Sequence, residues 1–337
     1  MGRRLLALGM GALALAQIAS ARAAEGENRG AIVLDLPIEC ILGKDCFLQQ
    51  LVDLDVSDGV SDPFCGTASY DGHQGTDIRV IYPNDISAGV SVLSSADGVV
   101  SSVRDGMADR LAFTAQEKER IGNRQCGNGV VVRHANGWET QYCHLRNGSV
   151  IAEVGQEVSA GDKIGEVGYS GRAQFPHVHM SVRKDGVHVD PFTGASIGQA
   201  CSPDRDMSAG LWSPEAAEIL NVKATQLLDA GLADVAVSNA VLRDGPPEIP
   251  TADSDALVGW IYLINVRAGD QVGVRVTGPD GEIYSQGVTK PLEKPNASYA
   301  MFAGRRSPPP LGDYKIEAMV IRDGELALHS TRQASVR

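Results

Sequence analysis

The sequence contains no run of basic residues, and its charge balance is acidic. It has 30 Lys and Arg against 42 Asp and Glu, a formal net charge of −12. This balance argues against nucleic acid or an anionic membrane surface as the main partner, because basic side chains dominate the binding of both. No apolar run after Ile18 approaches the length that a bilayer requires, so we expect no transmembrane segment in the mature chain.

The first 23 residues are typical of a secretory signal peptide. Arg3 and Arg4 form the positive start, residues 5–18 are a short apolar stretch, and Ala21-Arg22-Ala23 fits the small-x-small cleavage rule. The pattern predicts export across the inner membrane. No Cys lies at the predicted cleavage point, so a lipid anchor is not expected.

The sequence also lacks a tight Cys-x-x-Cys pair, which argues against a zinc site made of cysteines. An even number of cysteines in an exported chain favours disulfides, although six cysteines allow 15 pairings. Cys40 and Cys46 are close enough to close a small loop. All of them precede residue 202, so the crosslinks would serve the first domain only; they are Cys40, Cys46, Cys65, Cys126, Cys143 and Cys201.

At 337 residues the chain is long enough for two domains, and from Asp62 onward it reads as antiparallel β structure. Short β-branched runs are separated by turn residues, with a strong hairpin signal at Asn136-Gly137. Residues 105–125 interrupt the pattern with helix-compatible residues and are predicted to be an insertion bordering a cleft. The expected strands are 90–93, 99–103, 129–133, 138–144, 150–154, 158, 163–167 and 177–183.

A helix and a second β region are expected after residue 205. Ser213-Pro214-Glu215 is a typical helix start, and the helix would present an apolar stripe at Leu220, Ala224, Leu227 and Leu228 and end at Gly231. A Pro-rich linker ends at Pro250. The pattern after it is typical of a small β-sandwich, with strands expected at 257–266, 271–277, 282–288, 298–303 and 314–321.

Two histidines, His177 and His179, occur in an otherwise apolar strand. Alternation places both on one face, with Val178 and Met180 pointing into a core. Upstream, His73 and Asp77 lie four residues apart in a glycine-containing segment. A His–Asp pair is often only a hydrogen bond, but combined with one histidine of the doublet it supplies a three-ligand set suited to zinc.

Such a set leaves the fourth position to a water molecule, whose pKa zinc would lower. The second histidine of the doublet would then act nearby as an acid or base. By strand alternation Tyr142 and His144 share a face, which makes His144 a candidate for orienting the water or stabilising an oxyanion. The alternative is a surface histidine at the end of a strand.

The order of these motifs resembles the LytM/lysostaphin-type zinc metallopeptidases. The match consists of His-x-Gly-x-Asp at residues 73–77, Tyr-x-His-Leu at 142–145 and His-x-His at 177–179, with glycine-spaced strands at 154–158 and 160–165. It covers roughly residues 62–193. The resemblance implies a mainly β fold, in which an antiparallel LytM-like (duplicated hybrid motif-like) peptidase domain precedes the small β-sandwich.

The resemblance further implies a zinc endopeptidase that cuts peptide cross-links or stems of bacterial peptidoglycan with metal-activated water. It assigns the zinc ligands to His73, Asp77 and His179 and the catalytic roles to His144 and His177, leaving open which of the two takes the proton. The implied location is the periplasm or cell envelope, where the divisome or other cell-wall enzymes are candidate partners. His134 and His188 are interpreted as structural.

Three features depart from the family pattern. Residues 173–177 read Ala-Gln-Phe-Pro-His rather than the usual Ser/Thr-Gly-Pro-His, the 105–125 insertion is long, and the cysteine count is high. Two alternative functions remain open: a non-catalytic regulator of another cell-wall hydrolase, and a peptidase that acts on proteins. The C-terminal domain could bind a wall component, contact a partner or shield the groove.

These inferences give an expected domain order. A signal peptide (1–23) and an N-terminal segment (24–61), packed along the edge of the main domain, would precede the peptidase domain (62–205). A helix and linker (206–250) would then lead to the C-terminal β domain (251–337).

Overall fold

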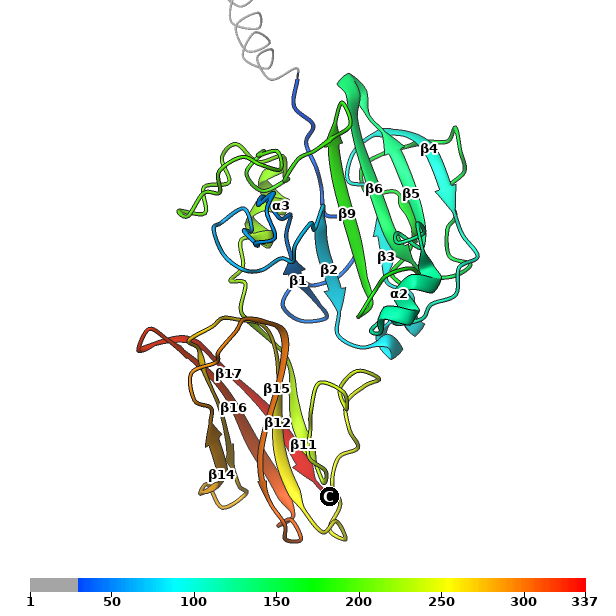
Figure 1. Cartoon of the computed structure of the whole chain (residues 1–337). Helices are drawn as coiled ribbons and strands as arrows, with labels where there is room; N and C mark the ends of the chain where they lie inside the picture. The colour runs from blue at the N-terminus through cyan, green and yellow to red at the C-terminus, as the bar shows by residue number, and fades with distance from the viewer. Residues whose placement is uncertain (1–29) are drawn as a thin grey trace, which may run out of the picture. The chain divides into compact units, whose positions relative to one another are not determined.

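An eight-stranded antiparallel sheet forms the first half of the computed structural model, which describes residues 30–337 (Figure 1). The strand order is β1-β2-β9-β6-β5-β4-β7, with β10 paired to β9. A separate two-stranded sheet joins β3 to β8. The bounds are β1 Cys46–Gln50, β2 Thr76–Val80, β3 Ser91–Leu93, β4 Gly98–Arg104, β5 Asn128–Arg133, β6 Trp138–Leu145, β7 Glu157–Val158, β8 Lys163–Glu166, β9 His177–Lys184 and β10 Val187–His188.

The two faces of strand β9 differ as the alternation of its residues predicts. Val178 and Met180 are buried in the core beneath the sheet, with 0% of their surface exposed. Asp77 of β2 lies opposite His179 in the antiparallel register, so these two side chains emerge on the same face. The predicted strand and its polar face are therefore confirmed.

The connections of this sheet follow local turn and capping rules. Asn136 and Gly137 both have positive φ, 57° and 76°, and join β5 to β6 through a short 3-10 turn (η2, Ala135–Gly137), which confirms the hairpin. The 105–125 insertion contains helix α2 (Ala115–Ile121), which begins with a Thr114/Glu117 capping box. A second 3-10 helix, η1 (Pro83–Ala88), follows β2. The expected strand at 150–154 does not form.

The second half contains two sheets that share one core. The first sheet has the order β11-β12-β15 and the second the order β14-β13-β16-β17. Leu232, Ile261, Val274 and Ile316, drawn from both sheets, are buried in the same cluster, as expected for a sandwich. The bounds are β11 Gln226–Ala233, β12 Leu257–Val266, β13 Gln271–Thr277, β14 Ile283–Val288, β15 Asn296–Arg305, β16 Gly312–Arg322 and β17 Glu325–Val336.

The helix expected to run to Gly231 is wrong beyond its second turn. Helix α3 covers only Pro214–Leu220, and residues 226–233 form β11. Adjacent residues of a strand point to opposite faces, so Leu227 packs in the core of the C-terminal sheets and Leu228 in a second cluster. Both faces of the strand are therefore buried, and its apolar spacing resembles a helical stripe. The region 206–250, expected to be helix and linker, thus includes a strand of the C-terminal sheets.

The second cluster joins the two halves of the chain. It contains Phe47 of β1 and Tyr82 together with Trp260 and Tyr262 of β12. The Asn265 Nδ2 group donates to the Gln49 carbonyl at 2.6 Å, and the Tyr82 hydroxyl donates to Asp229 at 2.9 Å. Residues 33–337 accordingly form one compact unit.

Three disulfides link all six cysteines, and each lies in the first 201 residues, as predicted. The pairs are Cys40–Cys46, Cys65–Cys201 and Cys126–Cys143. The N-terminal segment contributes β1, which pairs with β2 at the edge of the eight-stranded sheet. Among residues 30–337, no helix combines the length and apolarity needed to cross a membrane. The predicted signal peptide lies outside the described residues.

Candidate functional site

Three side chains predicted to bind a metal converge at one point above the eight-stranded sheet. The Asp77 Oδ1 atom lies 2.8 Å from His179 Nδ1 and 3.2 Å from His73 Nε2, and the two nitrogens are 3.1 Å apart. A Cβ atom at Gly75 would lie 2.6 Å from His179 Nε2, so only glycine lets the chain pass between His73 and Asp77 here. The His-x-Gly-x-Asp spacing therefore has a steric cause.

Hydrogen bonds fix which ring atom of each of these histidines faces the cluster. The Nδ1–H group of His73 donates to the Leu51 carbonyl at 2.6 Å, which leaves Nε2 unprotonated in the neutral ring. His179 Nε2 lies 3.0 Å from Ser181 Oγ, which can accept its proton in the tautomer that leaves Nδ1 as a ligand atom. His73 Nε2, His179 Nδ1 and Asp77 Oδ1 can therefore offer three lone pairs to one point, a donor set that fits a divalent metal ion.

His144 and His177 border this cluster. Their ring centroids are 4.5 Å apart, and the His144 ring is 5.9 Å from that of His179. The Nδ1–H of His177 donates to the Phe175 carbonyl at 2.8 Å, and the Nδ1–H of His144 donates to the Ser170 carbonyl at 2.7 Å. In both rings the Nε2 atom is therefore left for chemistry, and His177 Nε2 lies 3.7 Å from Asp77 Oδ1.

His144 reaches the site by a different route from the one predicted. Tyr142 pairs with Met180 and points into the core, where its hydroxyl accepts from the Ser95 N–H at 2.7 Å. Strict alternation would send His144 into that core as well. Its backbone instead has a φ of 64°, a left-handed conformation that turns the ring toward His177. The predicted shared face of Tyr142 and His144 is wrong, although His144 does lie at the site.

Burial and neighbouring charges lower the pKa values of His144, His177 and Asp77 and raise the pKa of His73. Burial lowers the pKa of His144 well below its ordinary value, and His177 and His179 lower it further. Burial also lowers the pKa of His177, against the attraction of Asp77. Burial works in the other direction on Asp77, but the rings of His73 and His177 hold the pKa of this carboxyl well below its usual range. For His73, burial is outweighed by Asp77, and the pKa is raised.

A cavity of about 470 Å³ opens beside the five residues. Asp77, His144 and His177 line it directly, and further walls come from β1 and β2, from the 105–125 insertion, from the segment before β9 and from the C-terminal half of the chain. A molecule in this cavity would contact His144 and His177.

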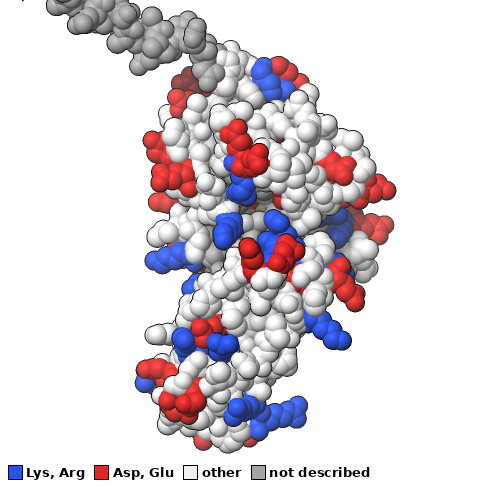
Figure 2. All heavy atoms as spheres, turned by 90° about the vertical axis from the view of Figure 1, so that its left-hand side faces the viewer, with Lys and Arg blue, Asp and Glu red and all other residues white. Residues whose placement is uncertain are grey.

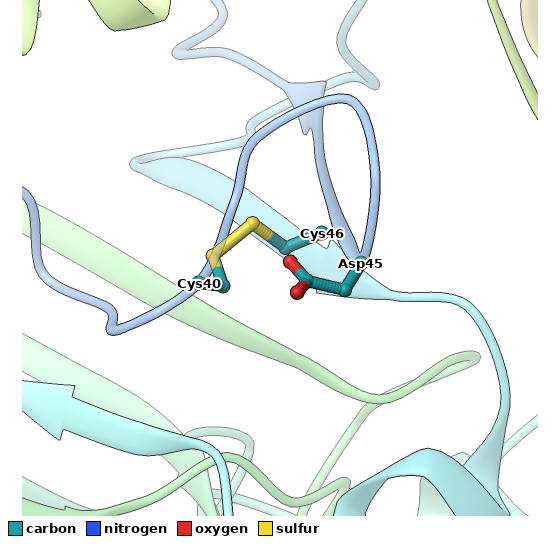
Figure 3. Close-up of side chains that lie close together, drawn as sticks. All are labelled: Cys40, Asp45 and Cys46. Carbon is teal, nitrogen blue, oxygen red and sulfur yellow. A yellow bond between two sulfur atoms is a disulfide. The ribbon is translucent and has the colours of Figure 1, made fainter.

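A second cluster with metal-ligating residue types does not fit a metal. Cys40, Asp45 and Cys46 lie close together, but the two sulfurs form a disulfide and Asp45 accepts from the Ile41 N–H (Figure 3). A disulfide sulfur has no thiolate to offer a metal. Of the two such groups among residues 30–337, only the His73–Asp77–His179 cluster is suited to an ion.

The comparison with known proteins agrees with this geometry. The sequence model of Peptidase family M23 matches residues 71–191, which include all five candidate residues. The chain contains an M23 peptidase domain.

Curated relatives of the M23 domain include enzymes with named activities. The DD-carboxypeptidase/endopeptidase Mpg of Neisseria meningitidis serogroup B is 37% identical over 107 residues, which is 32% of this chain and 20% of the relative. The peptidoglycan DD-endopeptidase ShyA of Vibrio cholerae is 31% identical over 137 residues, 40% of this chain and 26% of the relative. The chain thus spans about a fifth to a quarter of these relatives. A zinc-containing peptidase from Vibrio cholerae aligns with 48% of this chain and 41% of its own at 26% identity and a TM-score of 0.27.

Several residues that hydrogen-bond the candidate metal ligands are not part of the sequence motifs. Ser181, the partner of His179, could have been found by alternation, since it is two residues further along the same strand face. The Leu51 carbonyl is 22 residues from His73 in sequence, and no local pattern connects them. The other two histidines lie outside the cluster. His134 bonds the Asp97 carbonyl and Thr140 Oγ1, and His188 lies in β10.

Proposed function

We propose that this chain is a zinc-dependent endopeptidase that hydrolyses peptide cross-links or stems of bacterial peptidoglycan. The observation that carries the proposal is the convergence of His73 Nε2, Asp77 Oδ1 and His179 Nδ1 beside two further histidines, His144 and His177, which line a cavity. The named activity of ShyA, peptidoglycan DD-endopeptidase, supports peptidoglycan as the substrate.

In this proposal His73, Asp77 and His179 hold the zinc ion. Two imidazoles and one carboxylate are a usual ligand set for catalytic zinc. The ion would supply a Lewis acid for the scissile carbonyl and lower the pKa of a water molecule. Leu51 and Ser181 orient the two ligand rings through the hydrogen bonds described above, as outer partners of zinc ligands generally do.

His144 and His177 carry the proton chemistry. Both rings are buried and have lowered pKa values, so they are neutral at neutral pH and their Nε2 atoms can accept a proton from the attacking water. The ring that becomes protonated then donates to the leaving amine. Until it does so, its new Nε2–H can bond the oxyanion of the tetrahedral intermediate, while the neighbouring ring, whose Nε2 only accepts, would orient the attacking water.

The proposed location is extracytoplasmic, in the periplasm or cell envelope. Three disulfides support this, because such bonds persist in oxidising compartments. We propose residues 62–205 as the peptidase domain, as the sequence predicts. The C-terminal domain is proposed to begin at β11 instead of residue 251, since β11 pairs with β12.

The test is digestion of purified peptidoglycan by the purified mature protein. Mass spectrometry of the released muropeptides should show new peptide ends, which disappear after metal removal and return when zinc is added. A chain that binds stoichiometric zinc yet releases no muropeptides would contradict the proposal. If the chain neither releases muropeptides nor binds zinc, the result would favour a non-catalytic regulator of another hydrolase, since such a regulator does not need the metal.

A further inference from the structure

The cavity at the candidate active site is completed by the C-terminal half of the chain. Besides the M23 domain, its lining includes Asn239, Leu242, Arg243 and Tyr262, and Ala297 and Ser298 at the start of β15. These residues belong to the same compact unit as the peptidase sheet and adjoin the shared cluster of Phe47, Tyr82 and Trp260. A substrate that fills the cavity would therefore touch both halves.

The charge of the cavity lining is opposite to that of the chain. Four of its residues are cationic, and the single acid, Asp77, belongs to the histidine cluster. None of the four forms an ion pair with an acidic group among residues 30–337; they are Arg79, Lys118, Arg172 and Arg243. The whole chain carries −12, and the face drawn in Figure 2 shows basic and acidic side chains interspersed. Unpaired cations in a concave site attract anions.

Three of these cations are grouped around the 105–125 insertion. Lys118 lies in helix α2 of the insertion, and the Arg243 guanidinium lies 3.6 Å from the ring centroid of Phe113. Arg172 precedes Ala173, whose carbonyl accepts from the Ala112 N–H at 2.8 Å. The positive charge of Arg172 also opposes the increase in the pKa of Tyr70 that burial and Asp77 cause, which relates Arg172 to the neighbourhood of the ligand cluster.

Arg79 differs from these three because it is buried and already occupied. Its guanidinium donates to Gln49 Oε1 at 2.8 Å and to the Ile81 carbonyl at 2.7 Å, and it lies over the rings of Phe175 and Tyr262. We assign it a structural role at the base of the cavity. Arg172 and Arg243 are both exposed and have planar guanidinium groups suited to a carboxylate.

We propose that Arg172 and Arg243 form a carboxylate-binding subsite, so that the cleft selects peptides bearing a free carboxylate and the C-terminal half takes part in substrate recognition. This inference rests on the proposed function for the identity of the substrate. Stem peptides of peptidoglycan carry free carboxylates, which match the chemistry of the subsite.

Binding of two matched peptides tests the subsite without requiring cleavage. The probes are a fluorescein-labelled stem tetrapeptide with free carboxylates and the same peptide with those groups amidated. Their dissociation constants are measured by fluorescence anisotropy on the zinc-loaded full chain carrying His177→Ala, which prevents turnover. We expect tighter binding of the carboxylate form, and a loss of about 10-fold with Arg172→Gln or Arg243→Gln, the size expected for one charged hydrogen bond.

Control variants distinguish the loss of a charge in the cavity from a loss of folded structure. Arg306→Gln removes an exposed arginine that does not line the cavity and should leave both dissociation constants unchanged. Arg243→Lys keeps the charge and should retain part of the preference. All variants should keep the parental melting temperature and the parental affinity for the amidated peptide.

Three outcomes would overturn the subsite: parental affinity of Arg172→Gln for the carboxylate peptide, parental affinity of Arg243→Gln, or an equal loss for both peptides. Failure of the subsite and failure of the proposed function give different results. If the wild-type chain digests peptidoglycan but shows no preference for the carboxylate form, only the subsite is wrong. If the preference holds in a chain that cannot digest peptidoglycan, only the proposed function is wrong.

Discussion

At the scale of single residues, the four histidines of the site are distinguished by what their second nitrogen contacts. Three of them donate an Nδ1 proton to a backbone carbonyl, of Leu51, Ser170 or Phe175, and so present Nε2. His179 is held through Nε2 by a side chain, Ser181, and presents Nδ1. A hydroxyl is easily removed by mutation and a backbone carbonyl is not, so His179 is the ring whose orientation can be tested most cleanly.

Ser181→Ala should weaken zinc binding by about 10- to 100-fold, the usual effect of removing an outer partner of a metal ligand. Without the hydroxyl, the Nε2 proton of His179 loses its acceptor and the ring is less firmly fixed. The zinc dissociation constant can be measured by competition with a chromophoric chelator. Ser101→Ala, which removes a hydroxyl on β4 that donates to the Val131 carbonyl, is the matched control. Equal zinc affinity in both variants would contradict the role of Ser181.

Four of the five candidate site residues could be predicted to meet because they occur in two local pairs, whereas the direction of His144 depends on its left-handed backbone. His73 and Asp77 share one short segment, and His177 and His179 share one strand face. The contacts that orient them were less predictable, since Leu51 and Ser170 come from other parts of the chain. The unpaired cations of the cavity also depend on tertiary structure, because Arg172 and Arg243 are far apart in sequence.

At the scale of elements, the end of β6 determines where His144 points. The His144 N–H donates to the Cys126 carbonyl at 2.8 Å, and Cys126 is joined to Cys143 by a disulfide. This crosslink therefore lies next to the left-handed residue that turns the ring into the site. The disulfide Cys40–Cys46 lies at the start of β1, in another part of the sheet, and neither bond contributes a residue to the cavity lining.

Replacing Cys126 and Cys143 together by alanine should reduce activity as well as stability. The loop of 17 residues that this bond closes is worth about 3 kcal/mol of unfolding free energy. Loosening the end of β6 should also lower kcat on a peptidoglycan substrate by misplacing His144. Both effects can be measured by denaturant unfolding and by steady-state kinetics below the melting temperature.

The matched variant replaces Cys40 and Cys46 by alanine. It should lose about 2 kcal/mol of unfolding free energy, somewhat less than the first variant, because the Cys40–Cys46 bond closes a shorter loop. Its kcat should stay at the wild-type level. If the two double variants lose kcat equally, the Cys126–Cys143 bond has no special connection to His144.

Two elements show the limits of periodicity. Both faces of β11 are buried in different clusters, so its leucines do not alternate with polar residues and periodicity predicts a helix there. β17 (Glu325–Val336) was not predicted because most of its residues are at least partly exposed. In contrast, β12 and β13 match their predicted bounds, since apolar runs with flanking turns identify buried strands well.

At the scale of the whole molecule, the two halves are joined through a common apolar cluster and by polar contacts. Phe47 of β1 and Trp260 of β12 are both almost fully buried there. Polar contacts such as Asn265 to Gln49 add to this connection. The sequence predicted two domains but not this joint core, because the apolar residues of β1 and β12 are about two hundred positions apart.

Because of this core, the described chain should unfold in one calorimetric transition. Phe47→Ala should lower the free energy of unfolding by roughly 3–5 kcal/mol, the usual cost of removing a buried aromatic ring, and should separate the transition into two. Leu326→Ala, at an exposed position of β17, is the control and should leave one transition. A single transition in Phe47→Ala, at the wild-type melting temperature, would contradict the joint core.

The central claim is that the His177-x-His179 pair has divided roles, with His179 on the metal and His177 on the chemistry. Zinc content and muropeptide release, measured together on His179→Ala and His177→Ala, test it most directly. The account predicts that His179→Ala contains little zinc and that His177→Ala keeps stoichiometric zinc, while both fail to cleave peptidoglycan. Equal loss of zinc in the two variants, or normal cleavage by His177→Ala, would contradict it.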